Sequence, residues 1–181
     1  FAFSCNIVLA QRYAVFILTA DRPDSIYILF NREPVFIESL MGDSFTTIQL
    51  RHAPVVIKFD SVTKLSRLSV TSYNWTGNFI GTDWIVEPGD SVHIHINFQM
   101  TNPSVNFKGH GSAKYKLAFE TRKLDEQIRA TEFEVYDNVK SHDQAYCDVD
   151  SLELQYLNMV KVKRKSLSPH VYRTWVADIQ S

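Results

Sequence analysis

The chain has 181 residues, enough for one hydrophobic core, and we expect residues 1–181 to form a single domain. Apolar residues make up 45% and aromatic residues 13%, which excludes an intrinsically disordered chain. Nineteen basic and 20 acidic residues give a net charge of -1, so no general nucleic-acid-binding surface is predicted.

Short runs of β-branched and aromatic residues, separated by turn residues, dominate the first half of the chain. They predict strands at Cys5–Leu9, Tyr13–Thr19, Ile26–Phe30 and Val35–Glu38, then at residues 55–59 and 68–70. The clearest strand is 92–98, in which Val92, Ile94, Ile96 and Phe98 alternate with polar residues after a turn at 87–90.

Alternating patterns continue in the second half, at 113–119, 133–135, 152–156, 160–162 and 171–177, and we interpret them as further strands. Only Lys123–Ala130, with Leu124 and Ile128 four residues apart, predicts a helix, of about two turns. The expected fold class is therefore all-β, a two-sheet antiparallel β-sandwich or jelly roll with at most one short helix.

Two histidines, His93 and His95, fall on one face of the clearest strand, with Cβ atoms about 7 Å apart. A third ligand would make a metal site, and the candidates are His52, His110, His142 and His170. Nothing in the sequence selects one of them. We therefore interpret the pair as solvent-facing or interface residues, and we predict no metal and no cofactor.

Aromatic residues gather between positions 73 and 84, among glycines and asparagines: Tyr73, Trp75, Phe79 and Trp84. Such a segment either caps the end of a sandwich or forms a binding surface. Asn74 begins Asn-Trp-Thr, a formal acceptor for N-glycosylation that matters only in a secretory pathway.

Catalytic motifs are missing from the sequence, which has no nucleophile elbow, phosphate-binding glycine loop or dinucleotide fingerprint. The carboxylate pairs Asp148 with Asp150 and Glu132 with Glu134 are typical of a solvated strand face. We therefore expect no enzymatic activity. The basic residues between 161 and 165 are interpreted as a solvated strand end, with a partner-binding or phosphate-binding patch as the alternative.

The two cysteines, Cys5 and Cys147, are interpreted as buried free thiols, with a disulfide as the alternative. No apolar stretch approaches the roughly 20 residues that a membrane-spanning helix needs. The first residue is Phe1 rather than Met, which is consistent with a processed fragment or with a designed terminus.

Residues 41–51, with the sequence MGDSFTTIQLR, resemble the Gly-acid-x-x-Ser/Thr-Leu/Ile segment of picorna-like virus capsid proteins, plant secoviruses in particular. The resemblance implies an icosahedral capsid subunit in a virion, which assembles with other capsid subunits through sandwich edges and loops and contacts a host receptor. The alternative is a secreted or extracellular sandwich that binds a carbohydrate, peptide or receptor through the aromatic segment.

Overall fold

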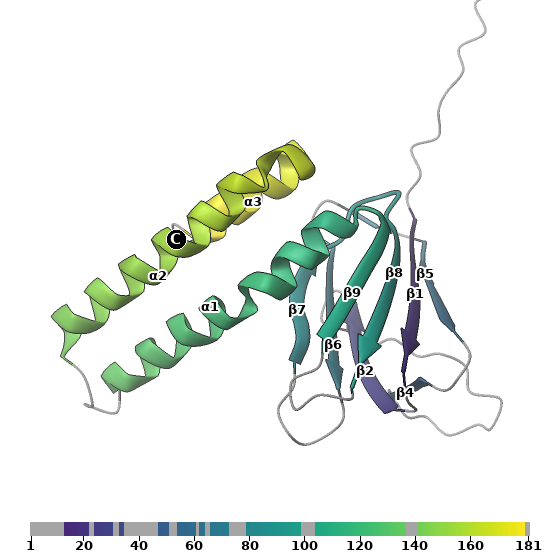
Figure 1. Cartoon of the computed structure of the whole chain (residues 1–181), viewed down its shortest axis with the longest axis horizontal. Coiled ribbons are helices and arrows are strands. Elements are labelled where there is room, and N and C mark those ends of the chain that lie inside the picture. The colour runs from purple at the N-terminus through teal and green to yellow at the C-terminus, as the bar shows by residue number, and fades with distance from the viewer. Residues whose placement is uncertain are drawn as a thin grey trace, which may run out of the picture.

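The computed structural model describes residues 13–21, 24–30, 33–34, 47–50, 54–60, 62–63, 66–72, 79–98, 104–136 and 141–179. Within these ranges, two β-sheets come first and helices follow (Figure 1). The strands are β1 (Ala14–Ala20), β2 (Asp24–Phe30), β3 (Glu33–Pro34), β4 (Thr47–Leu50), β5 (Val55–Phe59), β6 (Arg67–Ser72), β7 (Phe79–Ile85), β8 (Ser91–Asn97) and β9 (Ser104–His110). The helices are α1 (Ser112–Tyr136), α2 (His142–Val162), the short 3-10 helix η1 (Arg164–Ser166) and α3 (Pro169–Ile179).

The first sheet has the strand order β5-β1-β8-β9, and the second has the order β3-β2-β6-β7 with β4 also paired to β2. β1 and β8 run parallel, with Phe16 beside Val92, whereas every other described pair is antiparallel. The first sheet is therefore mixed. Its two central strands, β1 and β8, are separated by 70 residues of chain between Ala20 and Ser91.

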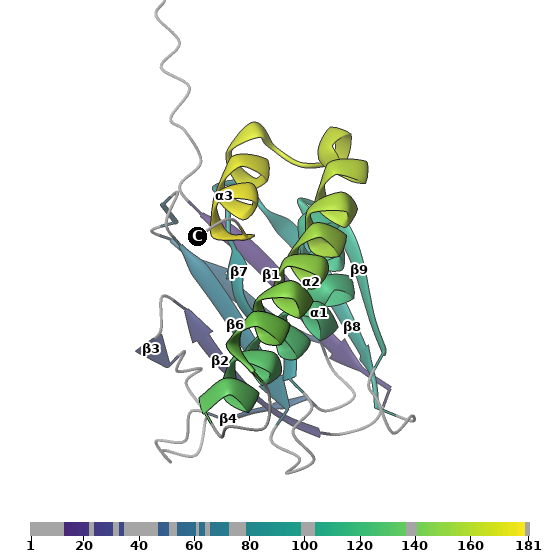
Figure 2. The same ribbon diagram turned by 90° about the vertical axis from the view of Figure 1, so that its left-hand side faces the viewer.

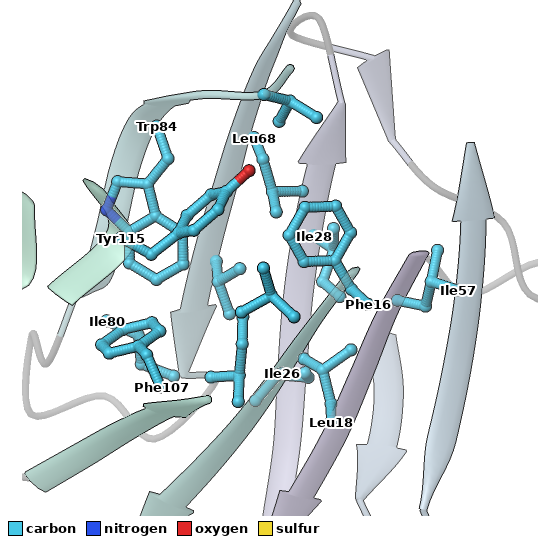
Figure 3. Packing of buried hydrophobic residues seen from close by; sticks show 14 of the residues in the cluster. Phe16, Leu18, Ile26, Ile28, Ile57, Leu68, Ile80, Trp84, Phe107 and Tyr115 are labelled. Atoms are coloured by element: carbon cyan, nitrogen blue, oxygen red, sulfur yellow. The ribbon is translucent and has the colours of Figure 1, made fainter. Parts of the chain in front are cut away.

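The two sheets enclose an apolar core, because alternate residues of each strand point inward. Figure 3 shows Phe16 and Leu18 from β1 facing Ile26 and Ile28 from β2. The predicted strand at 92–98 is confirmed: Val92, Ile94 and Ile96 are buried, while His93 and His95 are exposed. The strands predicted near 13–19, 26–30, 55–59 and 68–70 are also present, as β1, β2, β5 and β6.

Helix α1 begins at the open side of the core, where Tyr115 is completely buried. The ring of Tyr115 meets those of Phe16 and Trp84 edge to face, with centroids 5.5 and 5.6 Å apart. The helix then extends away from the sheets, and α2 runs back along it (Figures 1 and 2). A second apolar cluster lies beneath α2 and α3, formed by β7 and the three helices, and Ala118 of α1 contacts both clusters.

The prediction of an all-β sandwich or jelly roll with at most one short helix is wrong, because the described residues 112–136 and 141–179 contain three α-helices and η1. Residues 113–119 and 133–135, predicted as strands, belong to α1, and so does the predicted two-turn helix 123–130. Residues 152–162 belong to α2 and residues 171–177 to α3. The protein is an α+β protein, in which a helical layer follows the two sheets.

The helical segments bury residues at helical spacing. In α3 the buried side chains are Val171, Trp175 and Ile179, each four residues apart. α2 begins at Ser141, whose hydroxyl accepts a hydrogen bond from the backbone N–H of Gln144. The predicted strands Cys5–Leu9 and Val35–Glu38 lie outside the described residues, as do residues 41–46 and 51 of the segment that resembles capsid proteins.

Candidate functional site

The predicted pair His93 and His95 lies on the outward face of the first sheet, together with Thr19 of β1. The Thr19 hydroxyl oxygen is 2.9 Å from His93 Nε2 and 2.9 Å from His95 Nδ1. The two rings therefore converge on one oxygen. A threonine hydroxyl has a single proton, so if both rings are neutral, one ring accepts that proton and the other donates its N–H to the oxygen.

None of the predicted third ligands joins this pair among the described residues. His110 is at the end of β9, where it pairs with Ser91. His142 begins α2, and His170 is in the first turn of α3. His52 lies outside the described residues. In the part of the chain that the structure describes, no group of three or more His, Cys, Asp or Glu side chains is arranged to hold a metal ion.

The aromatic segment is only partly described. Trp84 is in β7, is 2% exposed and packs edge to face against Phe107 of β9. It is a core residue, so it does not contribute to a binding surface in this fold. Phe79 begins β7, and its side chain is not described; Tyr73, Asn74 and Trp75 lie outside the described residues.

A buried cluster of charged side chains joins the sheets to the helices, and no local sequence pattern predicted it. Asp90, just before β8, accepts hydrogen bonds from Lys114 Nζ at 2.8 Å and from the Tyr115 hydroxyl at 2.5 Å. The backbone N–H of Glu87 also donates to Asp90. Burial and the Asp90 carboxylate raise the pKa of Tyr115 well above its usual value.

The carboxylate of Glu87 extends this cluster to α3. It lies 2.9 Å from Lys114 Nζ and accepts a hydrogen bond from the Ser168 hydroxyl. Burial favours the neutral acid and acts to raise the pKa of Glu87. The net effect is nevertheless a lowered pKa, because the carboxylate accepts hydrogen bonds from Ser168 and Lys114 and lies near the charges of Lys114 and His170. Ser168 also accepts a hydrogen bond from Val171 N, so it caps the N-terminus of α3.

A pocket of about 560 Å³ lies beside this cluster. Its lining residues come from the turn before β8, the end of β9, the start of α1 and the segment before α3: Glu87, Pro88, Asp90, His110, Gly111, Lys114, Ser166, Leu167, Ser168 and His170. The Ser168 hydroxyl is held by Glu87 and by its capping bond. Lys114 is held by two carboxylates. The side chains of Glu87, Asp90, Lys114 and Ser168 are thus engaged in joining the elements.

The predicted carboxylate pairs are on helices. Asp148 and Asp150 are in α2, where Asp148 accepts a hydrogen bond from the Gln144 amide. Glu132 and Glu134 are in the last turns of α1. Cys147 is a free thiol in α2 and is exposed, so the expectation that it is buried is wrong, while Cys5 lies outside the described residues.

Helix α2 exposes large apolar side chains. The interpretation of residues 152–156 and 160–162 as strands did not predict this exposure. Tyr146, Leu154 and Val162 are 67%, 58% and 80% exposed. They are three of the five large apolar residues that are exposed among the described residues; the others are Tyr13 and Val56. Large apolar side chains exposed on one helix offer a surface that a partner can bury.

Among the described residues, no helix is both long and apolar enough to cross a membrane. The comparisons with known proteins found neither a matching family model nor a matching curated protein. The class that the fold itself defines is an α+β protein with a projecting helical hairpin, α1 and α2.

Proposed function

We propose that this protein is a structural subunit that assembles with other protein chains, and that it is not an enzyme. The observation that carries the proposal is the exposure of Tyr146, Leu154 and Val162 on the outer helix of the projecting hairpin. Water contact with such side chains is unfavourable, at about 25 cal/mol for each Å² of apolar surface. A partner that covers α2 removes that cost.

The buried polar groups support the same proposal. Asp90, Glu87, Lys114 and Ser168 satisfy one another and hold the helices against the sheets. This arrangement holds the start of the hairpin against the two sheets, as a subunit with a defined contact geometry requires. The Ser168 hydroxyl donates to a carboxylate and accepts from a backbone N–H, which is a capping role rather than that of an activated nucleophile.

The specific assembly we propose is an icosahedral virus capsid, in which related subunits are the partners. This form rests on the resemblance of residues 41–51 alone, because the jelly roll that the resemblance implies is not the fold of this chain. Of that segment, Thr47–Leu50 forms β4, which pairs with β2. An extracellular binding module that uses the aromatic segment is less well supported, because Trp84 is buried.

Native mass spectrometry combined with electron microscopy of the protein from its natural source tests the proposal. We expect closed particles that contain this chain in a fixed stoichiometry with itself or with related subunits. A chain that is purified as a glycosylated monomer, with a glycan on Asn74, would contradict the capsid proposal. Smaller assemblies of fixed composition would support the structural role and reject the icosahedral form.

A further inference from the structure

The exposed face of α2 has an internal symmetry. Tyr146, Asp150, Leu154, Asn158 and Val162 follow one another at four-residue intervals, and all five are exposed. Residues at this interval form a ridge that runs obliquely along a helix. Read from either end, the ridge has an apolar residue, a polar residue, the central Leu154, a polar residue and an apolar residue.

We propose that α2 pairs antiparallel with α2 of a second copy of this chain, the two helices crossing at Leu154. This inference rests on the proposed function and names one of its contacts. Two helices whose four-residue ridges interdigitate cross at about 50°, which brings the ridges alongside each other. Figure 2 shows α2 in front of α1, so the ridge-bearing helix is on the outer side of the hairpin.

Antiparallel pairing matches each residue of the ridge with a suitable partner. Leu154 meets Leu154 of the second copy, and Tyr146 meets Val162, so apolar side chains cover one another. Asp150 meets Asn158, whose amide donates hydrogen bonds to a carboxylate. Parallel pairing would instead place Asp150 beside Asp150, and like charges in contact are destabilising.

The charges along α2 favour the same direction. Its N-terminal half contains Asp143, Asp148 and Asp150, its last turn contains Lys161, and three more basic residues follow in its C-cap and in η1: Lys163, Arg164 and Lys165. In an antiparallel pair the acidic end of each helix lies toward the basic end of the other. The complementarity is therefore with a second copy of the same helix, as a two-fold symmetric contact requires.

A contact made by one helix face is small, so the pair is expected to be weak, with a Kd on the order of 10–100 μM. Sedimentation equilibrium of the intact chain between about 5 μM and 500 μM, a range that brackets this Kd, measures it. We expect a reversible monomer–dimer equilibrium, which Leu154→Asp abolishes. Because Leu154 is exposed, this variant should keep the circular dichroism spectrum of the wild type.

A charge exchange tests the direction of pairing. Asn158→Asp places a carboxylate against Asp150 of the second copy, and we expect it to weaken dimerisation about tenfold. The double variant Asp150→Asn with Asn158→Asp restores the acid–amide pair and should restore the dimer. If the double variant dimerises no better than Asn158→Asp alone, the antiparallel register is wrong.

Disulfide trapping tests the crossing point. In a background with Cys5→Ser and Cys147→Ser, Leu154→Cys should form an intermolecular disulfide on mild oxidation. The matched control keeps Cys147 and Leu154, because two Cys147 residues of this pair lie about 20 Å apart along the axes, beyond the reach of a disulfide.

Equal cross-linking of the two proteins, or a chain that stays monomeric at 500 μM, overturns the α2 pairing. Neither result decides the proposed structural role, which the particles isolated from the natural source test separately. A dimer that forms in solution but survives Leu154→Asp would place the contact on another surface.

Discussion

Lys114 of α1 and Asp90 of the turn before β8 form a buried ion pair, with the lysine Nζ 2.7 Å from one carboxylate oxygen and 2.8 Å from the other. Both side chains are almost completely removed from solvent. The pair connects the first sheet to the helix from which the hairpin projects. The orientation of the hairpin therefore depends on an electrostatic contact as well as on apolar packing.

Lys114→Met should strongly destabilise the fold, because among the described residues it leaves the buried Asp90 charge with only the Tyr115 hydroxyl and the Glu87 N–H as hydrogen-bond donors. Removal of one member of a buried pair costs about 3–5 kcal/mol. Urea unfolding followed by circular dichroism measures the loss. Lys116→Met is the control, since the Lys116–Glu120 pair is exposed and should contribute less than about 1 kcal/mol. Equal losses for the two variants would show that burial does not set the strength of the pair.

Gly111→Ala should also destabilise the junction between β9 and α1. Gly111 has a φ of 81°, and an added Cβ would lie 2.0 Å from the Asp90 carboxylate oxygen. Because the carboxylate is held by Lys114 and Tyr115, it cannot move aside without losing those bonds. We expect a loss of at least about 2 kcal/mol, measured by thermal unfolding. Ala130→Gly, at an exposed position of α1, should cost only about 1 kcal/mol. A wild-type melting temperature for Gly111→Ala would contradict this account.

Asp125→Asn should stabilise the protein near neutral pH. Burial, opposed by Arg129 and assisted by Glu126, raises the pKa of Asp125 from 3.8 to about 6. The folded state therefore holds this proton more tightly than the unfolded state, and stability falls as the pH rises from about 4 to about 6. Above that range the charged carboxylate carries its full cost, which we place at about 1 kcal/mol after screening by solvent.

The comparison is urea unfolding of Asp125→Asn and wild type at about pH 3.5 and pH 7.5, on either side of the titration. The stabilisation should be present at the higher pH and absent at the lower. Glu153→Gln of α2 serves as the control for the loss of one acidic charge from the helices. A gain for Asp125→Asn that is the same at both pH values would show that the ionised carboxylate is not its source.

Thr19→Val should release the rings of His93 and His95 without unfolding the sheet. Both hydrogen bonds are exposed, so the stability should change by less than about 1 kcal/mol. Nitrogen-detected NMR of the imidazoles should show fixed tautomers in the wild type and averaged ones in the variant. His142→Gln, which removes a histidine from α2, should leave both ring signals unchanged. Averaged tautomers in the wild type would mean that Thr19 does not hold the rings.

The strands were predictable where one face is buried. In β8, buried Val92, Ile94 and Ile96 alternate with exposed residues such as His93 and His95. An α-helix would not bring alternate residues together on one buried face. The helices were missed because short windows of a helix can alternate by chance. In α2, Leu152, Leu154 and Tyr156 alternate along the sequence, yet Tyr156 is buried and Leu154 is exposed. The longer spacing of Ala145, Tyr156 and Val160 is the helical signal, and it appears only over several turns.

The candidate site was predictable only in part. The spacing of His93 and His95 placed both on one face, but the approach of Thr19 depends on the parallel pairing of β1 with β8, which no local pattern encodes. The cluster around Asp90 has the same origin, since its members come from positions 87 to 168. The prediction was limited by the long sequence separation between the interacting residues, and not by weak secondary-structure propensities of the segments that contain them.

The parallel pairing of β1 with β8 also has a consequence for synthesis on the ribosome. β1 lies between β5 and β8, so its backbone hydrogen bonds are complete only after residue 97 has left the exit tunnel. Until then the apolar side chains of β1, Phe16 and Leu18, have half of their sheet and no helix to cover them. Contacts between segments so distant in sequence form slowly, because a long loop must close before they bring any gain. We therefore expect the newly made first half of the chain to be the species that is most exposed to chaperone binding and to aggregation.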